Sequence, residues 1–155
     1  MNDKMLVLRR SIQHDMEDIA GIYKVLERYT LDARTEEEHL IVISYYLHNL
    51  YNAFENIFQN IAAAFENSID DVGRWHTQLL ERMRLDVMPL RPAVIDHEAY
   101  TALDELRRFR HMFRHAYSLQ LDPMRLGIVL HKALLLKSLY RTLFDDFLHF
   151  LENLT

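Results

Sequence analysis

The chain has 155 residues, contains no cysteine and carries a formal net charge of −5 at pH 7. A chain of this length buries a sizeable core without staples, and the lack of thiols excludes both a disulfide-bonded scaffold and cysteine catalysis. The acidic balance excludes a protein that coats nucleic acid with its whole surface, because phosphate binding needs local positive charge.

The first ten residues place charges on both sides of a short apolar run, so we expect them to form neither a signal peptide nor a membrane anchor. No stretch approaches the ~20 uninterrupted apolar residues of a membrane span. We therefore expect a cytoplasmic protein that does not associate with membranes.

Apolar residues recur every three or four positions along the chain, and the whole sequence has only three glycines and three prolines. This periodicity predicts helices, because strands alternate at two and need more turn residues. No long linker or internal repeat divides the chain. We predict a single all-α domain over residues 1–155, an antiparallel bundle of about five helices.

The first two helices are expected over residues 4–29 and from Thr35 to about Asn67. Thr35 and Glu38 have the spacing of a capping box at the start of the second helix. The side of that helix opposite its apolar stripe is unusual, since five polar residues fall within about 80° of one another. This face is either solvated or serves self-association or a binding groove. It consists of Tyr45, Asn49, Asn52, Asn56 and Asn60.

The remaining helices follow from capping and breaking residues. A third helix is expected over residues 72–85, before Pro89 and Pro92 break the chain. Asp96 is a suitable N-cap for the fourth helix. The fifth is expected over residues 122–151, with an aspartate as its cap and a proline in its first turn.

The end of the fourth helix carries the most unusual segment. Residues 107–115 contain four arginines, two histidines and no acid. On a helical wheel Arg107, Arg110 and Arg114 lie opposite the apolar side. A guanidinium beside an imidazole that titrates near neutral pH is sufficient to cleave a phosphodiester without a metal. The alternative is a solvated basic face that complements the helix dipole.

The geometry of this segment sets a condition on its chemistry. Arg110 and His115 are about 140° apart on an ideal helix. We expect His115 to lie in a loosened last turn, where its ring can approach the long Arg110 side chain. Tyr117 leans toward the apolar side, so it is either a packed ring with a bonded hydroxyl or a functional phenol.

The order Arg110, four residues, His115, one residue, Tyr117 resembles the signature of the HEPN superfamily, and specifically that of the HepT-like toxins. Residues 51–58 (YNAFENIF) and 75–83 (WHTQLLERM) are also similar to the segments that such toxins carry on their second and third helices. The similarity extends from the expected second helix to the C-terminus, and it implies a HEPN-like bundle.

The resemblance implies a metal-independent endoribonuclease without a cofactor, in which two copies of the chain form a homodimer with a shared RNA cleft. The ribose 2′-hydroxyl would attack the adjacent phosphate and leave a 2′,3′-cyclic phosphate, so DNA would not be a substrate. His115 would be the acid and base, and Arg110 would hold the phosphate oxygens. His111 and Arg114 would orient the substrate or strengthen the positive electrostatic field, and Glu55 would position a cation.

The resemblance further implies a type VII-like toxin-antitoxin pair. The partner would be an MNT-type nucleotidyltransferase antitoxin that adenylylates Tyr117. The added phosphate would place negative charge beside Arg110 and His115, where RNA should bind. Such toxins mostly have asparagine or aspartate directly after the arginine, whereas this chain has His111, so which imidazole carries the proton stays open.

Two other classes of function compete with this interpretation. Residues 36–39 and 146–149 each place an acid and a histidine three positions apart, as in bundles that hold two metal ions, with Glu17 and Glu55 as the additional ligands. The stronger competitor is a non-catalytic dimeric helical adaptor or RNA-binding module. It would use the basic segment and the asparagine face for recognition.

Overall fold

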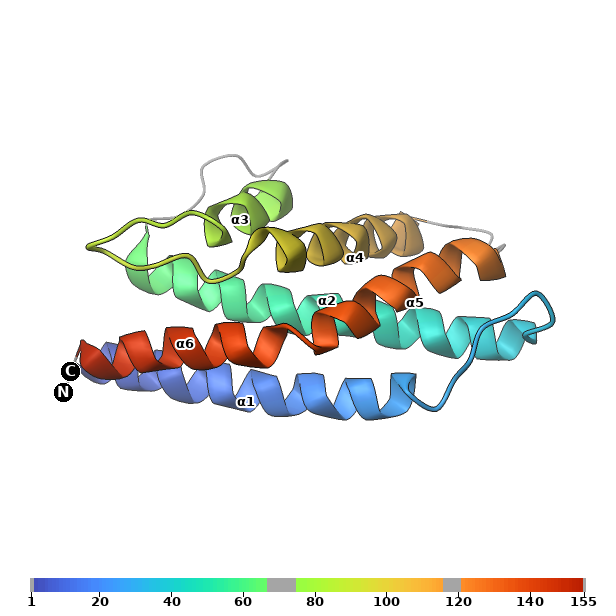
Figure 1. Ribbon diagram of the computed structural model, residues 1–155, viewed down its shortest axis with the longest axis horizontal. Helices are drawn as coiled ribbons and strands as arrows, with labels where there is room; N and C mark the ends of the chain where they lie inside the picture. Colours follow the sequence, from blue (N-terminus) through green and yellow to red (C-terminus); the bar gives the residue numbers. More distant parts are fainter. Residues whose placement is uncertain (1, 67–74, 116–120, 155) are drawn as a thin grey trace.

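The computed structural model describes residues 2–66, 75–115 and 121–154, and in these residues it contains six helices and no strand (Figure 1). The prediction of an all-α bundle is confirmed, with six helices in place of five. In chain order they are α1 (Asp3–Leu26), α2 (Glu37–Phe65), α3 (Trp75–Met83), α4 (His97–His115), α5 (Pro123–Lys137) and α6 (Tyr140–Asn153).

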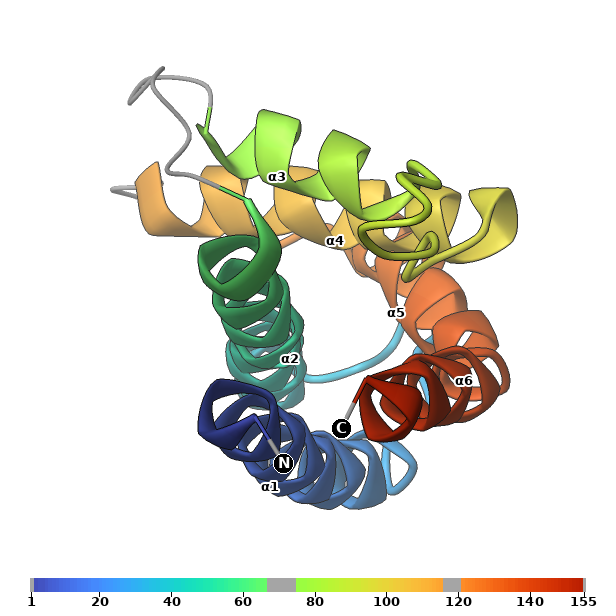
Figure 2. The same cartoon turned by 90° about the vertical axis from the view of Figure 1, so that its left-hand side faces the viewer.

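The helices surround one apolar core. Figure 2 shows the arrangement of the helices end-on. The long α2 runs along α1 on one side and contacts α3, α4 and α5 on the others. The centre of the core is aromatic: Phe54 of α2 lies 5.6 Å from the Tyr140 ring of α6, and Phe58 lies 6.2 Å from Phe144. In the described part of the chain, no helix has the length and apolar content to cross a membrane.

Two of the three predicted helix caps are confirmed. Asp96 accepts a hydrogen bond from the Ala99 amide at 2.8 Å, and Asp122 accepts one from the Met124 amide at 3.0 Å. The capping box at Thr35 is wrong, because its hydroxyl accepts from the Asp32 amide in the preceding turn. The N-cap of α2 is Glu36, which makes no side-chain cap bond.

The predicted fifth helix is in fact two, because the chain turns at Ser138 between α5 and α6 (Figure 1). The Ser138 hydroxyl donates to the Leu135 carbonyl at 2.6 Å, which competes with the regular helical ladder. The amides of Ser138 and Leu139 also bond carbonyls three residues back, so the last turn of α5 is tightened. No proline or glycine marks this break.

The asparagine face of α2 is partly an internal contact. Asn56 donates to the Asp15 carboxylate at 2.8 Å and Asn60 donates to the Ser11 hydroxyl at 3.2 Å, so both bind α1. Asp15 is buried, and this burial raises the pKa of its carboxyl group. Neither a solvated face nor a self-association face therefore describes these two positions.

Candidate functional site

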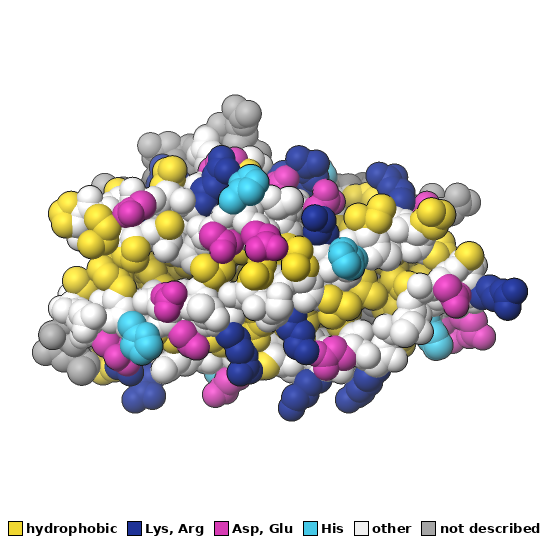
Figure 3. Space-filling view, in the orientation of Figure 1, with side chains coloured by type: hydrophobic (Ala, Val, Ile, Leu, Met, Phe, Trp, Pro, Cys, Tyr) yellow, Lys and Arg dark blue, Asp and Glu magenta, His cyan; other side chains and the backbone are white. Residues whose placement is uncertain are grey.

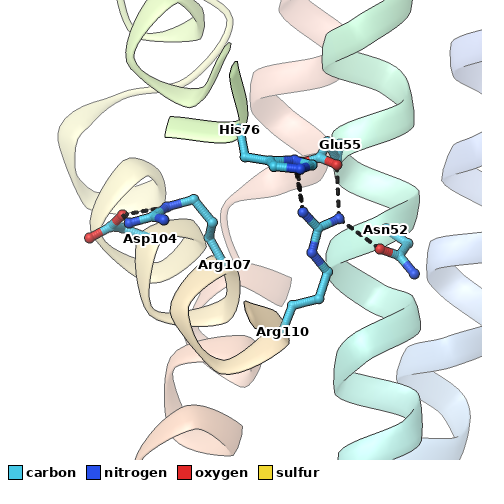
Figure 4. A network of polar contacts seen from close by, with 6 residues as sticks. All are labelled: Asn52, Glu55, His76, Asp104, Arg107 and Arg110. Carbon is cyan, nitrogen blue, oxygen red and sulfur yellow. Dashed lines mark hydrogen bonds and ion pairs between the residues drawn. The ribbon is translucent and has the colours of Figure 1, made fainter. Parts of the chain in front are cut away.

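Arg110 of the candidate signature is buried against α2, with only 5% of its surface exposed. Its Nη1 donates to Glu55 Oε1 at 2.8 Å and to Asn52 Oδ1 at 2.9 Å, and its Nη2 donates to Glu55 Oε2 at 3.3 Å (Figure 4). The helical-wheel placement of Arg110 on the solvent side is therefore wrong. A buried carboxylate on the facing helix gives the guanidinium a partner inside the protein.

His76 completes this network from α3. Its Nδ1 lies 2.8 Å from Glu55 Oε2 and 2.9 Å from Arg110 Nη2 (Figure 4). One ring nitrogen either donates to the carboxylate or accepts from the guanidinium, so the tautomer decides which bond forms. The neighbouring Trp75 ring lies 3.7 Å from the His76 ring, centroid to centroid. Three helices thus meet at one ion pair.

The Arg110–Glu55 pair is almost fully enclosed, and its exposed neighbour is Asn52. Glu55 is buried, whereas Asn52 is exposed. The Tyr51 ring lies 4.9 Å below the Arg110 Cζ, at cation–π distance. The buried Arg110 Nε has no hydrogen-bond partner among the described residues. A ligand can therefore approach Arg110 most easily from the Asn52 side.

The other three arginines of the basic segment differ in how much charge they offer. Asp104 accepts from Arg107 Nε at 3.0 Å (Figure 4). The same carboxylate lies 3.0 Å from Arg108 Nη2, so it pairs with both arginines. Arg114 is exposed and has no hydrogen bond or ion pair within the described ranges. The positive charge that is free to meet an anion is concentrated at Arg114, at the end of α4.

Three predicted residues lie at or beyond that end. His111 is exposed on α4, and His115 is the last residue of the helix. The side chain of His115 and the whole of Tyr117 lie outside the described residues, so the distance from Arg110 to either is not part of this geometry. Glu55, which the sequence singled out as a partner for a cation, binds Arg110.

His48 of α2 is a second imidazole next to this region, and the sequence did not single it out. Its ring centroid lies 5.5 Å from that of Phe113. Burial lowers the pKa of the half-buried His48, and the charges of Arg110 and Arg114 lower it further. Its position four residues before Asn52 and seven before Glu55 was the available signal, because such residues share a helix face.

A groove of about 670 Å³ lies between α4 and α5, on a different face of α4 from the Arg110 network. Its lining is apolar around Phe109 and Met112, with Arg108 and Arg125 among its charged residues. Figure 3 shows apolar side chains exposed between the positions of these two helices, with charged ones around them. The signature helix therefore borders both a basic end and an apolar surface.

The two-metal interpretation finds no support in the described ranges. They contain no group of three or more histidine, aspartate or glutamate side chains that could hold a metal ion. Glu55, one of the ligands that this interpretation needed, is already bound by Arg110.

No curated protein and no solved structure gives a significant match to the chain. The model of one protein family, described as HepT-like protein, matches residues 42–151. The match runs from α2 to α6 and includes the Arg110 network and the signature residues. The chain therefore belongs to the HepT-like protein family.

Proposed function

We propose that this protein is a toxin-like endoribonuclease that cleaves RNA without a metal, by attack of the ribose 2′-hydroxyl on the neighbouring phosphate. Membership of a HepT-like family supports a ribonuclease-related function. The observation that carries the proposal is the held position of Arg110 near the exposed Arg114, which has no ion pair among the described residues at the end of α4. Groups fixed before the substrate arrives stabilise developing charge without reorganisation.

In this proposal Arg110 stabilises the negative charge that builds on the phosphate. Its bond to the neutral, exposed Asn52 is the one that an incoming phosphate oxygen can replace, because Glu55 stays buried behind it. Exchanging an amide for an anion strengthens the hydrogen bond to a guanidinium. Arg114 and His111 orient the phosphate chain, and His115 transfers the proton.

The proposal includes two partners besides RNA. A second copy of the chain brings its own signature to a shared cleft. An MNT-type nucleotidyltransferase antitoxin silences the toxin by transferring AMP to Tyr117. Each added phosphate would compete with RNA for Arg110 and Arg114, which is a physical reason for inhibition.

The direct test is cleavage of mixed RNA in the presence of a chelator. The wild-type protein should produce 2′,3′-cyclic phosphate and 5′-hydroxyl ends, and RNA with 2′-deoxy sugars should stay intact. His115→Ala should lower the cleavage rate by about 10²-fold to 10⁴-fold, the usual contribution of a proton-transfer group. Arg110→Lys is the matched variant, because it keeps the charge opposite Glu55 while losing the planar fork. Cleavage that needs a metal would contradict the proposal.

The antitoxin part is tested with Tyr117→Phe. This variant should cleave RNA at the wild-type rate and should escape adenylylation, because it lacks the accepting hydroxyl. Mass spectrometry of the toxin after incubation with the antitoxin and ATP measures the transfer. If Tyr117→Phe fails to fold, the ring has a packing role; if it is still adenylylated, another residue is the acceptor.

One observation favours a second function, a non-catalytic adaptor or RNA-binding module. Both terminal nitrogens of Arg110 are bonded to protein groups, as in an arginine that only holds helices together. Under this alternative the protein binds RNA through Arg114 without cleaving it, and neither His115→Ala nor Arg110→Lys changes this binding. Binding without cleavage by the wild type would decide for the adaptor.

A further inference from the structure

The antiparallel register of α2 and α4 places His48 level with the end of the signature helix. Arg110 of α4 lies against Asn52 and Glu55 of α2, and Phe113, about one turn further along α4, lies against His48, about one turn earlier on α2. His115 follows Phe113 by two residues, which is about 3 Å along a helix axis.

The state of the His48 ring suits a proton acceptor. Its Nδ1 is buried without a hydrogen-bond partner in the part of the chain that the structure describes, so a substrate hydroxyl can reach the half-buried ring only at Nε2. The ring as a whole is half-buried, with its centroid 5.5 Å from that of Phe113, and it is close enough to Arg110 and Arg114 for their charges to act on it. A packed ring explains neither the orphaned nitrogen nor the position beside two arginines.

We infer that His48 is a catalytic residue of the ribonuclease site, the base that takes the proton from the 2′-hydroxyl while His115 acts as the acid. The inference rests on the function proposed above. His48 accepts the proton as O2′ forms its bond to phosphorus. The bond from phosphorus to O5′ then breaks, and the leaving O5′ takes a proton from the His115 imidazolium. Solvent afterwards returns both rings to their starting charges.

The charges around His48 fit this role. Among the described residues, the charged groups that act on its ring are Arg110 and Arg114, both on α4, and Glu55 of the same helix is paired with Arg110. Burial and the two arginines lower the pKa of His48, so its ring is neutral at pH 7. A base must be unprotonated, and activity should therefore fall on the acid side at a pH below the ordinary histidine value of about 6.5.

The test compares wild type, His48→Gln and His39→Gln in single-turnover cleavage of an oligoribonucleotide from pH 4.5 to 8. His39 is the matched control because it lies on the same helix, more than two turns before His48 and away from Arg110, with its ring against that of Tyr29. His48→Gln should cleave at least 100-fold more slowly and lose the acid limb of the pH profile. His39→Gln should keep the wild-type rate and profile.

A second substrate separates the base from the acid. A uridine 3′-phosphate ester of p-nitrophenol has a leaving group that needs no protonation, so His115→Ala should regain most of its activity on it. His48→Gln should stay slow on both substrates, because the 2′-hydroxyl still needs a base.

The outcomes distinguish this inference from the proposed function. If the wild type cleaves RNA and His48→Gln keeps the same rate and the same acid limb, only the role of His48 is overturned. A wild-type protein that cleaves no RNA overturns the proposed function, and the role of His48 with it. If His48→Gln does not fold, as judged by circular dichroism, His48→Asn replaces it and the same criteria apply.

Discussion

At the scale of single residues, the Arg110–Glu55 pair is both a candidate catalytic feature and a structural one. Both side chains have a relative exposure of 6%. Removing two charges from water is costly, and the cost is offset only when the hydrogen bonds are nearly complete. Asn52 and His76 supply the additional contacts. Deleting Arg110 would therefore leave His76 as the remaining partner of the buried Glu55 carboxylate.

This predicts that Glu55→Ala destabilises the fold by about 3–5 kcal/mol, the usual cost of removing one partner of a buried pair. The matched control is Glu27→Ala, because Glu27 pairs with Lys137 while both side chains are nearly half exposed. Such a pair contributes about 0–1 kcal/mol. Urea unfolding followed by circular dichroism measures both. Equal losses in the two variants would show that removing one partner costs no more in the buried pair than in the exposed pair.

The sequence could identify these residues but not their contacts. The spacing from Arg110 to Tyr117 indicated the family, and the family match agrees. A helical wheel weighs only apolar against polar side chains, so it placed Arg110 in solvent. His76 and His48 come from α3 and α2, and their distance from Arg110 depends on tertiary packing that no local pattern encodes.

At the scale of elements, predictions succeeded where one side chain decides the outcome locally. Asp96 and Asp122 cap their helices because an aspartate there can reach an amide two or three residues on. Thr35 could have capped α2 in the same way, but its hydroxyl accepts a hydrogen bond from the Asp32 amide in the preceding turn. The sequence did not predict the break at Ser138 for a related reason. A serine in the middle of a helix usually has little effect on it, but the Ser138 hydroxyl bonds a backbone carbonyl at the point where the chain turns.

The asparagine face shows the same limit between elements. Regular spacing along α2 revealed that one side of the helix is polar, but not what that side touches. Asp15 and Ser11 of α1 supply the partners for two of its amides, and Asn52 binds Arg110. A polar stripe on a long helix can thus be either a solvated face or an internal hydrogen-bonding surface. The neighbouring helices determine which of the two it is.

At the scale of the whole molecule, a second buried arginine fixes α3 in the position that brings His76 to the site. Arg91 lies in the connection between α3 and α4 and is fully buried. Its guanidinium binds Glu66 at the end of α2 and three backbone carbonyls around the end of α3, and these bonds use all five of its N–H groups. The carbonyls belong to Arg82, Leu85 and Pro92.

This clamp predicts that Arg91→Met lowers both stability and RNA cleavage. The substitution leaves Glu66 and three carbonyls without their donor, so we expect a loss of about 3–5 kcal/mol in unfolding free energy. Arg82→Met is the matched control, because Arg82 approaches the same carboxylate at 3.5 Å from a half-exposed position; its loss should be about 0–1 kcal/mol. If α3 loosens as a unit, amide hydrogen exchange should rise over Trp75–Met83 and stay unchanged over Asp3–Leu26. Exchange that rises equally in both helices would show that Arg91 supports the whole bundle and not the placement of His76.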